Sequence, residues 1–252
     1  MWRRNRILFF LLALLPLQSL AHCRLTIGYG ADPIPPFINK PDSAHLQVPG
    51  ESILLVNQAA KNIGCQIHWL ALPNMRVLHA TQNGQLDGAL FYSWTAERDK
   101  RFIYPKQQGV VDTRRSLATL DYMLYKRTDS QLAWDGHTYQ QLTCLIGYNE
   151  GWSIGADLAR HGVAVESAKS AEQNLKKLEK GRICGYATLE QAGDDAIAHY
   201  PDHPFAKLPI PLTRKEFYLI VNPGSYQRQT PRIEALWDEI GRLSEEKHNK
   251  IK

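Results

Sequence analysis

Several motifs that signal a particular chemistry are missing from this sequence. It contains no H-E-x-x-H, no Walker A loop and no G-x-G-x-x-G, and its four cysteines include no C-x-x-C pair. These absences argue against a zinc protease, a P-loop enzyme and a dinucleotide-binding enzyme. The sequence also has no block of basic residues and no nucleic-acid motif, which argues against a nucleic-acid partner. We therefore expect neither a metal nor another cofactor.

A second long apolar run is missing as well, and the first one stands at the N-terminus. Residues 1–21 begin with the basic MWRRNR, continue with the apolar ILFFLLALL and end in the small-residue site SLA. This order is typical of a cleaved signal peptide, and the apolar run is short for a membrane span. Cleavage removes three arginines and no acid, which leaves 27 basic against 25 acidic residues. We expect an exported, periplasmic protein without a strong net charge.

The remaining chain alternates strand-like and helix-like segments. Residues 23–30 (CRLTIGYG) and 66–72 (QIHWLAL) predict strands, and the helical spacing of apolar residues over 52–64 predicts a helix. A shorter helix over 73–84 and a strand over 86–92 follow. This β-α-β-α-β order predicts a parallel sheet that is covered on both faces.

The same pattern returns in the second half of the chain. Ile146-Gly147-Tyr148 repeats Ile27-Gly28-Tyr29, and LKKLEKGRICGYA (175–187) repeats LHATQNGQLDGAL (78–90). The repeat predicts two similar α/β lobes rather than one continuous sheet. An amphipathic stripe over 230–252 predicts a final helix that packs on the rest of the molecule.

The cysteines fit this division into lobes. Export to an oxidising compartment favours disulfides, and four cysteines allow three pairings. Cys23 and Cys65 each precede a strand of the first lobe, and Cys144 and Cys184 stand in the corresponding region of the second. We predict the bridges Cys23–Cys65 and Cys144–Cys184, one within each lobe.

Gly151-Trp152-Ser153-Ile154-Gly155 fits the G-x-S-x-G pattern of a nucleophile elbow. Asp194 or Asp195 and then His199 or His203 would complete the order Ser, Asp, His of a serine hydrolase. No HGGG-type oxyanion loop precedes the serine. The alternative is a Gly/Ser turn that faces an anionic ligand.

SWTAERDKR, residues 93–101, places Arg98 in the first turn of a helix that Thr95 would cap. The N-terminal end of a helix is the unfavourable end for a cation. Either the segment is a solvated run of charges, or Arg98 binds an anion there.

The context of this segment resembles a known family. Gly84-x-Leu86-Asp87-Gly88, an apolar strand, Ser93, Thr95-x-Glu97-Arg98 and Tyr104-Pro105 follow in the order seen in the bacterial extracellular solute-binding proteins of family 3. PPF at 35–37, P-x-x-R at 73–76, IGYNEGWS and LEKGRICGY are similar to further parts of that pattern. Cys184 stands where the family has an aspartate, and Leu189, followed by Glu190, stands where the family usually has the aspartate that binds an ammonium group.

The resemblance implies a type II periplasmic binding fold with a ligand cleft between two α/β lobes. Lobe 1 would comprise residues 22–118 and, with the C-terminal helix, 214–252, and lobe 2 would comprise 119–213. In the family, the arginine that matches Arg98 binds the ligand's carboxylate. The expected ligand-binding residues are Phe37, Arg76, Tyr92, Ser93, Arg98, Trp152, Ser153 and Glu190.

The function that the resemblance implies is the binding of a small carboxylate-bearing solute by a monomer without enzymatic activity. An ABC permease or a membrane sensor would detect the closed lobes. Three alternatives stay open: a dehydratase of the same fold with Glu190 as acid or base, the serine hydrolase at Ser153, and a pair of lobes that binds a protein. Whether the ligand carries an amine is also open.

Overall fold

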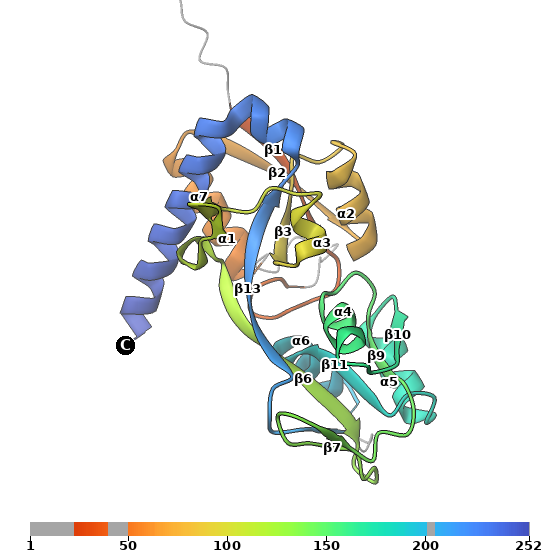
Figure 1. Cartoon of the computed structure of the whole chain (residues 1–252). Helices are drawn as coiled ribbons and strands as arrows, with labels where there is room; N and C mark the ends of the chain where they lie inside the picture. Colours follow the sequence, from red (N-terminus) through yellow and green to blue (C-terminus); the bar gives the residue numbers. More distant parts are fainter. Residues whose placement is uncertain (1–22, 40–49, 201–204, 252) are drawn as a thin grey trace, which may run out of the picture.

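The computed structural model describes residues 23–39, 50–200 and 205–251, and Figure 1 shows them as two lobes joined by long strands. The predicted signal peptide, residues 1–21, lies outside the described residues. Among the helices of the described part, none has both the length and the apolar character that crossing a membrane requires.

Lobe 1 is built on three parallel strands. Strand β1 (Cys23–Gly30) lies between β2 (Cys65–Leu72) and β3 (Gly88–Ser93), and it pairs with β2 over its whole length. Helices α1 (Glu51–Asn62) and α2 (Asn74–Gln82) connect the strands and pack into separate hydrophobic clusters. Every residue of β3 is buried, as expected for a parallel strand that is covered on both faces.

Two long strands join the lobes (Figure 1). Strand β6 (Ala118–Arg127) leaves lobe 1, and β13 (Thr213–Val221) returns to it, antiparallel to the first half of β6. Strand β13 also pairs with β3, and β6 also pairs with β11 (Gly185–Leu189) of lobe 2. The lobes are distinct, but their strands form one nine-stranded ladder. The expectation that the sheet would not be continuous is therefore wrong. Strand β13 pairs with β3 of lobe 1, β6 pairs with β11 of lobe 2, and the two crossover strands pair with each other.

Lobe 2 repeats the order of lobe 1. Strand β9 (Ile146–Asn149) lies between β10 (Val165–Ala168) and β11. Its helices are α4 (Ile154–Arg160), α5 (Ala171–Glu179) and α6 (Glu190–Ala198). The short elements of the molecule are β4 (Lys106–Gln107), β5 (Val110–Val111), the 3₁₀ turn η1 (Thr113–Arg115), β7 (Ala133–Trp134), β8 (Tyr139–Gln140) and β12 (Phe205–Lys207).

Helix α7 (Pro223–Ile251) packs back on lobe 1 against α1. It begins before the predicted range and bends at Gln229, whose backbone is non-helical. Pro231 lies two residues further on, and a proline inside a helix removes a hydrogen bond and commonly produces such a bend. After the bend, Trp237 is fully buried, and its indole N–H donates to the carbonyl of Leu219 at 2.8 Å.

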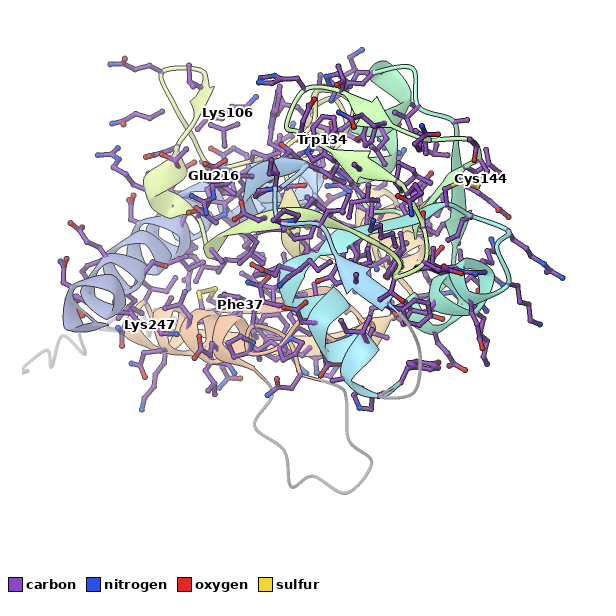
Figure 2. The ribbon with its side chains drawn as sticks, turned by 90° about the horizontal axis from the view of Figure 1, so that it is seen from below. Phe37, Lys106, Trp134, Cys144, Glu216 and Lys247 are labelled. Carbon is purple, nitrogen blue, oxygen red and sulfur yellow. A yellow bond between two sulfur atoms is a disulfide. The ribbon has the colours of Figure 1, made fainter. Side chains whose placement is uncertain are left out.

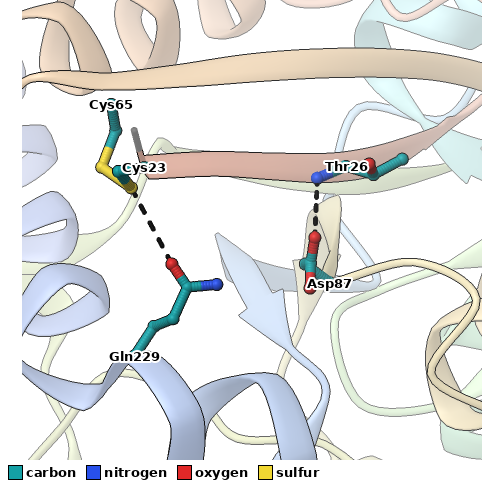
Figure 3. Close-up of a disulfide and its surroundings, with 5 residues drawn as sticks. All are labelled: Cys23, Thr26, Cys65, Asp87 and Gln229. Carbon is teal, nitrogen blue, oxygen red and sulfur yellow. Dashed lines mark hydrogen bonds between the residues drawn. A yellow bond between two sulfur atoms is a disulfide. The ribbon is translucent and has the colours of Figure 1, made fainter. Parts of the chain in front are cut away.

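Both expected disulfides are formed, with Cα atoms 4.5 Å apart in Cys23–Cys65 and 5.5 Å apart in Cys144–Cys184. The first bridge joins the starts of β1 and β2 (Figure 3). The second joins the segments that lead into β9 and β11. The two bridges are therefore not equivalent, since one links the first and second strands of its lobe and the other links the first and third.

Candidate functional site

Arg98 lies in α3 (Ala96–Asp99), a short helix that follows β3. The hydroxyl of Thr95 caps this helix by accepting from the backbone N–H of Arg98 at 3.1 Å, as the sequence predicts. The Arg98 side chain is only 6% exposed. Its Nη1 donates to the carbonyl of Ser93 at 2.7 Å, and its Nη2 donates across to the carbonyl of Gly151 in lobe 2 at 2.6 Å.

Arg98 is a buried cation that forms no ion pair with another described residue. Among the described residues, no carboxylate forms an ion pair with its guanidinium, which instead lies over the ring of Tyr92, 5.2 Å from the centroid. A buried charge is costly unless it is paired. Packing alone therefore does not account for an arginine at this position.

Strand β3 ends in a bulge beside Arg98. Phe91 is an additional residue between the pairs Tyr92–Tyr218 and Leu90–Leu219, and its φ is 71°. A positive φ is strained for a bulky side chain, and bulges next to functional sites redirect the side chains that follow them. After the bulge, the buried hydroxyl of Ser93 meets the hydroxyl of Ser153 at 2.8 Å.

Ser153 lies among further polar groups between the lobes. Lys215 of β13 donates to its hydroxyl at 3.2 Å and forms an ion pair with Asp157 of α4. Burial lowers the pKa of Lys215, and the neighbouring Asp157 opposes that shift. Burial also raises the pKa of Tyr122 to about 12, while its hydrogen bond with Ser153 acts in the opposite direction. Hydroxyl groups from both lobes therefore gather beside Arg98.

Asp32 is a site residue that the sequence reasoning missed. It follows β1 and accepts from the side-chain amides of Asn149 at 3.3 Å and Asn74 at 3.4 Å. Burial raises its pKa, and the hydrogen bond from Asn149 lowers it by less. An acid directly after the first strand could have indicated this role, because ligands of open α/β sheets bind at the carboxyl ends of the strands.

Arg98 and Asp32 line the same small cavity between the lobes. Its volume is about 20 Å³, little more than one water molecule requires. Aromatic rings form much of its wall, with Trp152 edge-on to Tyr122 and Phe91 stacked on Phe217. The residues of the wall are Gly30, Asp32, Ile34, Ile38, Asn74, Leu90, Phe91, Tyr92, Ser93, Arg98, Tyr122, Gly151, Trp152, Leu189 and Phe217.

Solved structures share the fold of this chain. A histidine kinase sensor domain with similarity to periplasmic binding proteins superposes with a TM-score of 0.74 at 14% identity, over 91% of this chain and 94% of that one. The chain therefore has the two-lobed periplasmic binding protein fold. An arginine transport periplasmic binding protein from Legionella pneumophila (TM-score 0.68, 16% identity, 90% and 94% covered) agrees. The glutamate-bound GluR0 ligand-binding core from Nostoc punctiforme has the same fold, with a TM-score of 0.64 at 16% identity over 88% of this chain and 93% of that one. Neither protein-family models nor curated proteins gave a match.

The periplasmic binding fold brings five of the predicted residues together. Tyr92, Ser93, Arg98 and Trp152 line the cavity, and Ser153 reaches it through its bond to Ser93.

The structure does not bring the other three predicted residues to the cavity wall. Phe37 packs behind the wall with its ring centroid 5.6 Å from that of Phe91. Arg76 is exposed on α2. The carboxylate of Glu190 accepts from Lys207 at 2.6 Å on the outside of lobe 2, while the preceding Leu189 lines the cavity.

Among the described residues, neither enzymatic alternative has its catalytic groups in place, while His203, one of the two histidines named for the hydrolase, lies outside them. The hydroxyl of Ser153 bonds to Ser93 and Lys215, and no histidine of the described part bonds to it. The Glu190 carboxylate, held by Lys207, does not face the cavity, so it is not placed as the acid or base of a dehydratase.

A second, wider hollow is lined in part by the Lys215–Asp157 pair. Both residues line a groove of about 1710 Å³, together with Trp134 and Glu216, which are labelled in Figure 2. This volume exceeds that of a typical small-molecule pocket. The cavity at Arg98 is lined by a buried guanidinium that the groove lacks, and it is the better candidate for recognition of a small solute.

Proposed function

We propose that this chain is a solute-binding protein of family 3, and that it clamps a small carboxylate-bearing solute between its lobes. The observation that carries the proposal is Arg98, a buried guanidinium at the contact between the lobes whose partners are neutral carbonyl groups. A guanidinium fork binds a carboxylate through two parallel hydrogen bonds, and these bonds strengthen where water is excluded. The fold and its neighbours support a binding role rather than catalysis.

The hydroxyl groups beside Arg98 would complete the carboxylate site. Ser93 and Ser153 approach from opposite lobes, and Lys215 places a second positive charge behind Ser153. Each hydroxyl can donate to a carboxylate oxygen when the lobes enclose it.

Asp32 supports an amino-acid-like solute. It places a partly buried carboxylate in the cavity that also contains Arg98. Opposite charges in one cavity complement a zwitterion, with the carboxylate at Arg98 and the ammonium at Asp32. The glutamate bound to the GluR0 core is such a solute. An organic acid without an amine would use only the Arg98 side.

The lobes would close by a hinge motion that the solute selects. Strands β6 and β13 are the connections that would flex, with residues 22–118 and 214–252 on one side and 119–213 on the other. After export and removal of residues 1–21, a monomer in the periplasm would present its closed form to an ABC permease or a membrane sensor.

A thermal-shift screen tests the proposal. The mature protein is heated with the standard L-amino acids and with short mono- and dicarboxylic acids. A solute at 100 times its Kd stabilises the protein by about 2.7 kcal/mol. We expect Arg98→Met to abolish the shift that the best solute produces. Arg101→Met removes a more exposed arginine three residues away and should preserve it. Equal shifts in wild type and Arg98→Met would reject the proposal.

A further inference from the structure

One turn of lobe 2, residues 149–153, provides the lobe 2 partners of three hydrogen bonds between the lobes. The side-chain amide of Asn149 donates to Asp32 at 3.3 Å, and Arg98 donates to the Gly151 carbonyl at 2.6 Å. The hydroxyls of Ser153 and Ser93 are bonded to each other at 2.8 Å. A single segment therefore makes polar contact with both charged groups of the cavity and with the end of β3.

The bond to Gly151 takes a donor that a solute would need. Nη1 and Nη2 of Arg98 each hold one carbonyl oxygen, from Ser93 and Gly151. A carboxylate offers its two oxygens to the same pair of nitrogens. The carbonyl oxygens satisfy the geometry of the fork, but they do not neutralise its charge. A solute carboxylate that approaches Arg98 from the side of lobe 2 therefore competes with the Gly151 carbonyl for an N–H of Nη2.

Trp152, the next residue, takes the space that a solute would need. Its indole lines the cavity edge-on to Tyr122, with ring centroids 6.1 Å apart. About 20 Å³ remains beside it, whereas small-molecule sites usually offer 300–1,000 Å³. The turn therefore occupies both the polar and the apolar part of the site.

Gly151 allows this close approach. Its φ is 78°, and a Cβ atom on it would lie 3.1 Å from the sulfur of Met75 on α2. A side chain at this position would have a strained backbone, and the neighbouring Met75 side chain would have to shift slightly to admit it. The absence of a side chain lets the backbone carbonyl reach Arg98.

We propose that the 149–153 turn acts as an internal ligand that holds the lobes together and competes with the solute. This inference rests on the proposed function, since it concerns the same cavity. A solute must displace the Gly151 carbonyl from Arg98 and move the Trp152 indole. The apparent affinity for solute is therefore reduced by the fraction of molecules in which the turn occupies the site, and Trp152 limits the size of the solute.

Small-angle scattering without any added solute tests the internal closure. The mature protein, with both disulfides intact, is compared with Trp152→Ala, Arg98→Met and the control Trp94→Ala, which truncates a tryptophan that is 43% exposed and outside the cavity. We expect wild type and Trp94→Ala to match the profile of the closed structure, and both site variants to have a larger radius of gyration. An expanded wild-type profile, or no expansion in either site variant, would overturn the inference.

The thermal-shift screen then separates competition from binding itself. We expect Trp152→Ala to reach its half-maximal shift at a concentration of the best amino or organic acid that is at least tenfold lower than for wild type. The variant should also respond to larger members of the set. An unchanged midpoint in Trp152→Ala would overturn the competition, while an Arg98-dependent shift in wild type would leave the proposed function intact.

Discussion

In both lobes the residue before the third strand makes the same backbone hydrogen bond. Its side chain is held by hydrogen bonds in lobe 1 and by a disulfide in lobe 2. The N–H of Asp87 donates to the carbonyl of Thr26 at 2.8 Å, and the N–H of Cys184 donates to the carbonyl of Leu145 at 2.9 Å. The Ile-Gly-Tyr segments that follow Thr26 and Leu145 are the repeat seen in the sequence. Asp87 and Cys184 therefore occupy equivalent positions.

In lobe 1 this position holds a hydrogen-bonded carboxylate. Asp87 accepts from the N–H of Thr26 at 2.8 Å (Figure 3) and from the hydroxyl of Ser225 at 2.7 Å. Ser225 belongs to α7, which returns to lobe 1 after the crossover. In lobe 2 the position holds the Cys144–Cys184 disulfide. A hydrogen-bonded carboxylate therefore holds the junction where the returning helix α7 supplies a second donor, and a disulfide holds the junction in lobe 2.

Removing the lobe 2 bridge should have the largest effect. Cys144→Ala with Cys184→Ala opens a link between residues 40 positions apart, and chain entropy predicts a loss of about 4 kcal/mol of unfolding free energy. Urea denaturation measures it. Thr143→Ala, beside the bridge, is the control. A loss below about 1 kcal/mol would show that the lobe 2 junction does not depend on its covalent bond.

Removing the lobe 1 anchor should cost less. Asp87→Ala leaves the N–H of Thr26 and the hydroxyl of Ser225 without their acceptor, which predicts a loss of about 2–3 kcal/mol. The same denaturation experiment measures it. Asp87→Asn keeps one acceptor oxygen and should lose less. Equal losses in the two variants would contradict the role of the carboxylate in both bonds.

Transferring the residues of the lobe 1 junction to lobe 2 tests whether the two junctions are interchangeable. Cys144→Leu with Cys184→Asp gives lobe 2 the residues of the lobe 1 junction, where Leu25 precedes Thr26. It should be about 1.5–3 kcal/mol more stable than Cys144→Leu with Cys184→Ala, the value of one hydrogen bond to a charged acceptor. If the two double variants unfold at the same urea concentration, the junctions are not interchangeable.

The loops that follow the first strand of each lobe differ too, and a substitution in the lobe 1 loop should have the smallest effect on stability. Asp32 of lobe 1 corresponds in the repeat to Gly151 of lobe 2. Because burial raises the pKa of Asp32 above 3.8 in the folded protein, the folded state holds the proton more tightly, and stability falls as pH rises through that window. Asp32→Asn should therefore raise the melting temperature at pH 7 and lose this gain near pH 3.

Asp129 supplies the control for that measurement. Arg127 lowers the pKa of Asp129, so Asp129→Asn should not raise the melting temperature at pH 7. A lower melting temperature for Asp32→Asn at pH 7 would contradict the assignment of Asp32 as a destabilising buried acid.

Local patterns predicted the lobes, the cysteine pairs and the Thr95 cap beside Arg98, because strand periodicity, turn glycines and helix caps are set by neighbouring residues. They missed Asp32, because its position depends on Asn149, which is 117 residues away and in the other lobe. The family resemblance placed Glu190 at the ligand, because the sequence does not show that Lys207 holds its carboxylate outside the cavity. The positive φ of Phe91 likewise follows from the pairing of β3 with β13.

The most direct test of the central claim is a calorimetric cycle at Arg98. The best solute from the screen and its carboxamide are each titrated into wild type and Arg98→Met. We predict that wild type binds the carboxylate form about 100-fold more tightly than the carboxamide, since a buried charged pair is worth 2 kcal/mol or more, and that Arg98→Met binds both forms equally weakly. The same preference for the carboxylate in both proteins would contradict the claim that Arg98 is the carboxylate site.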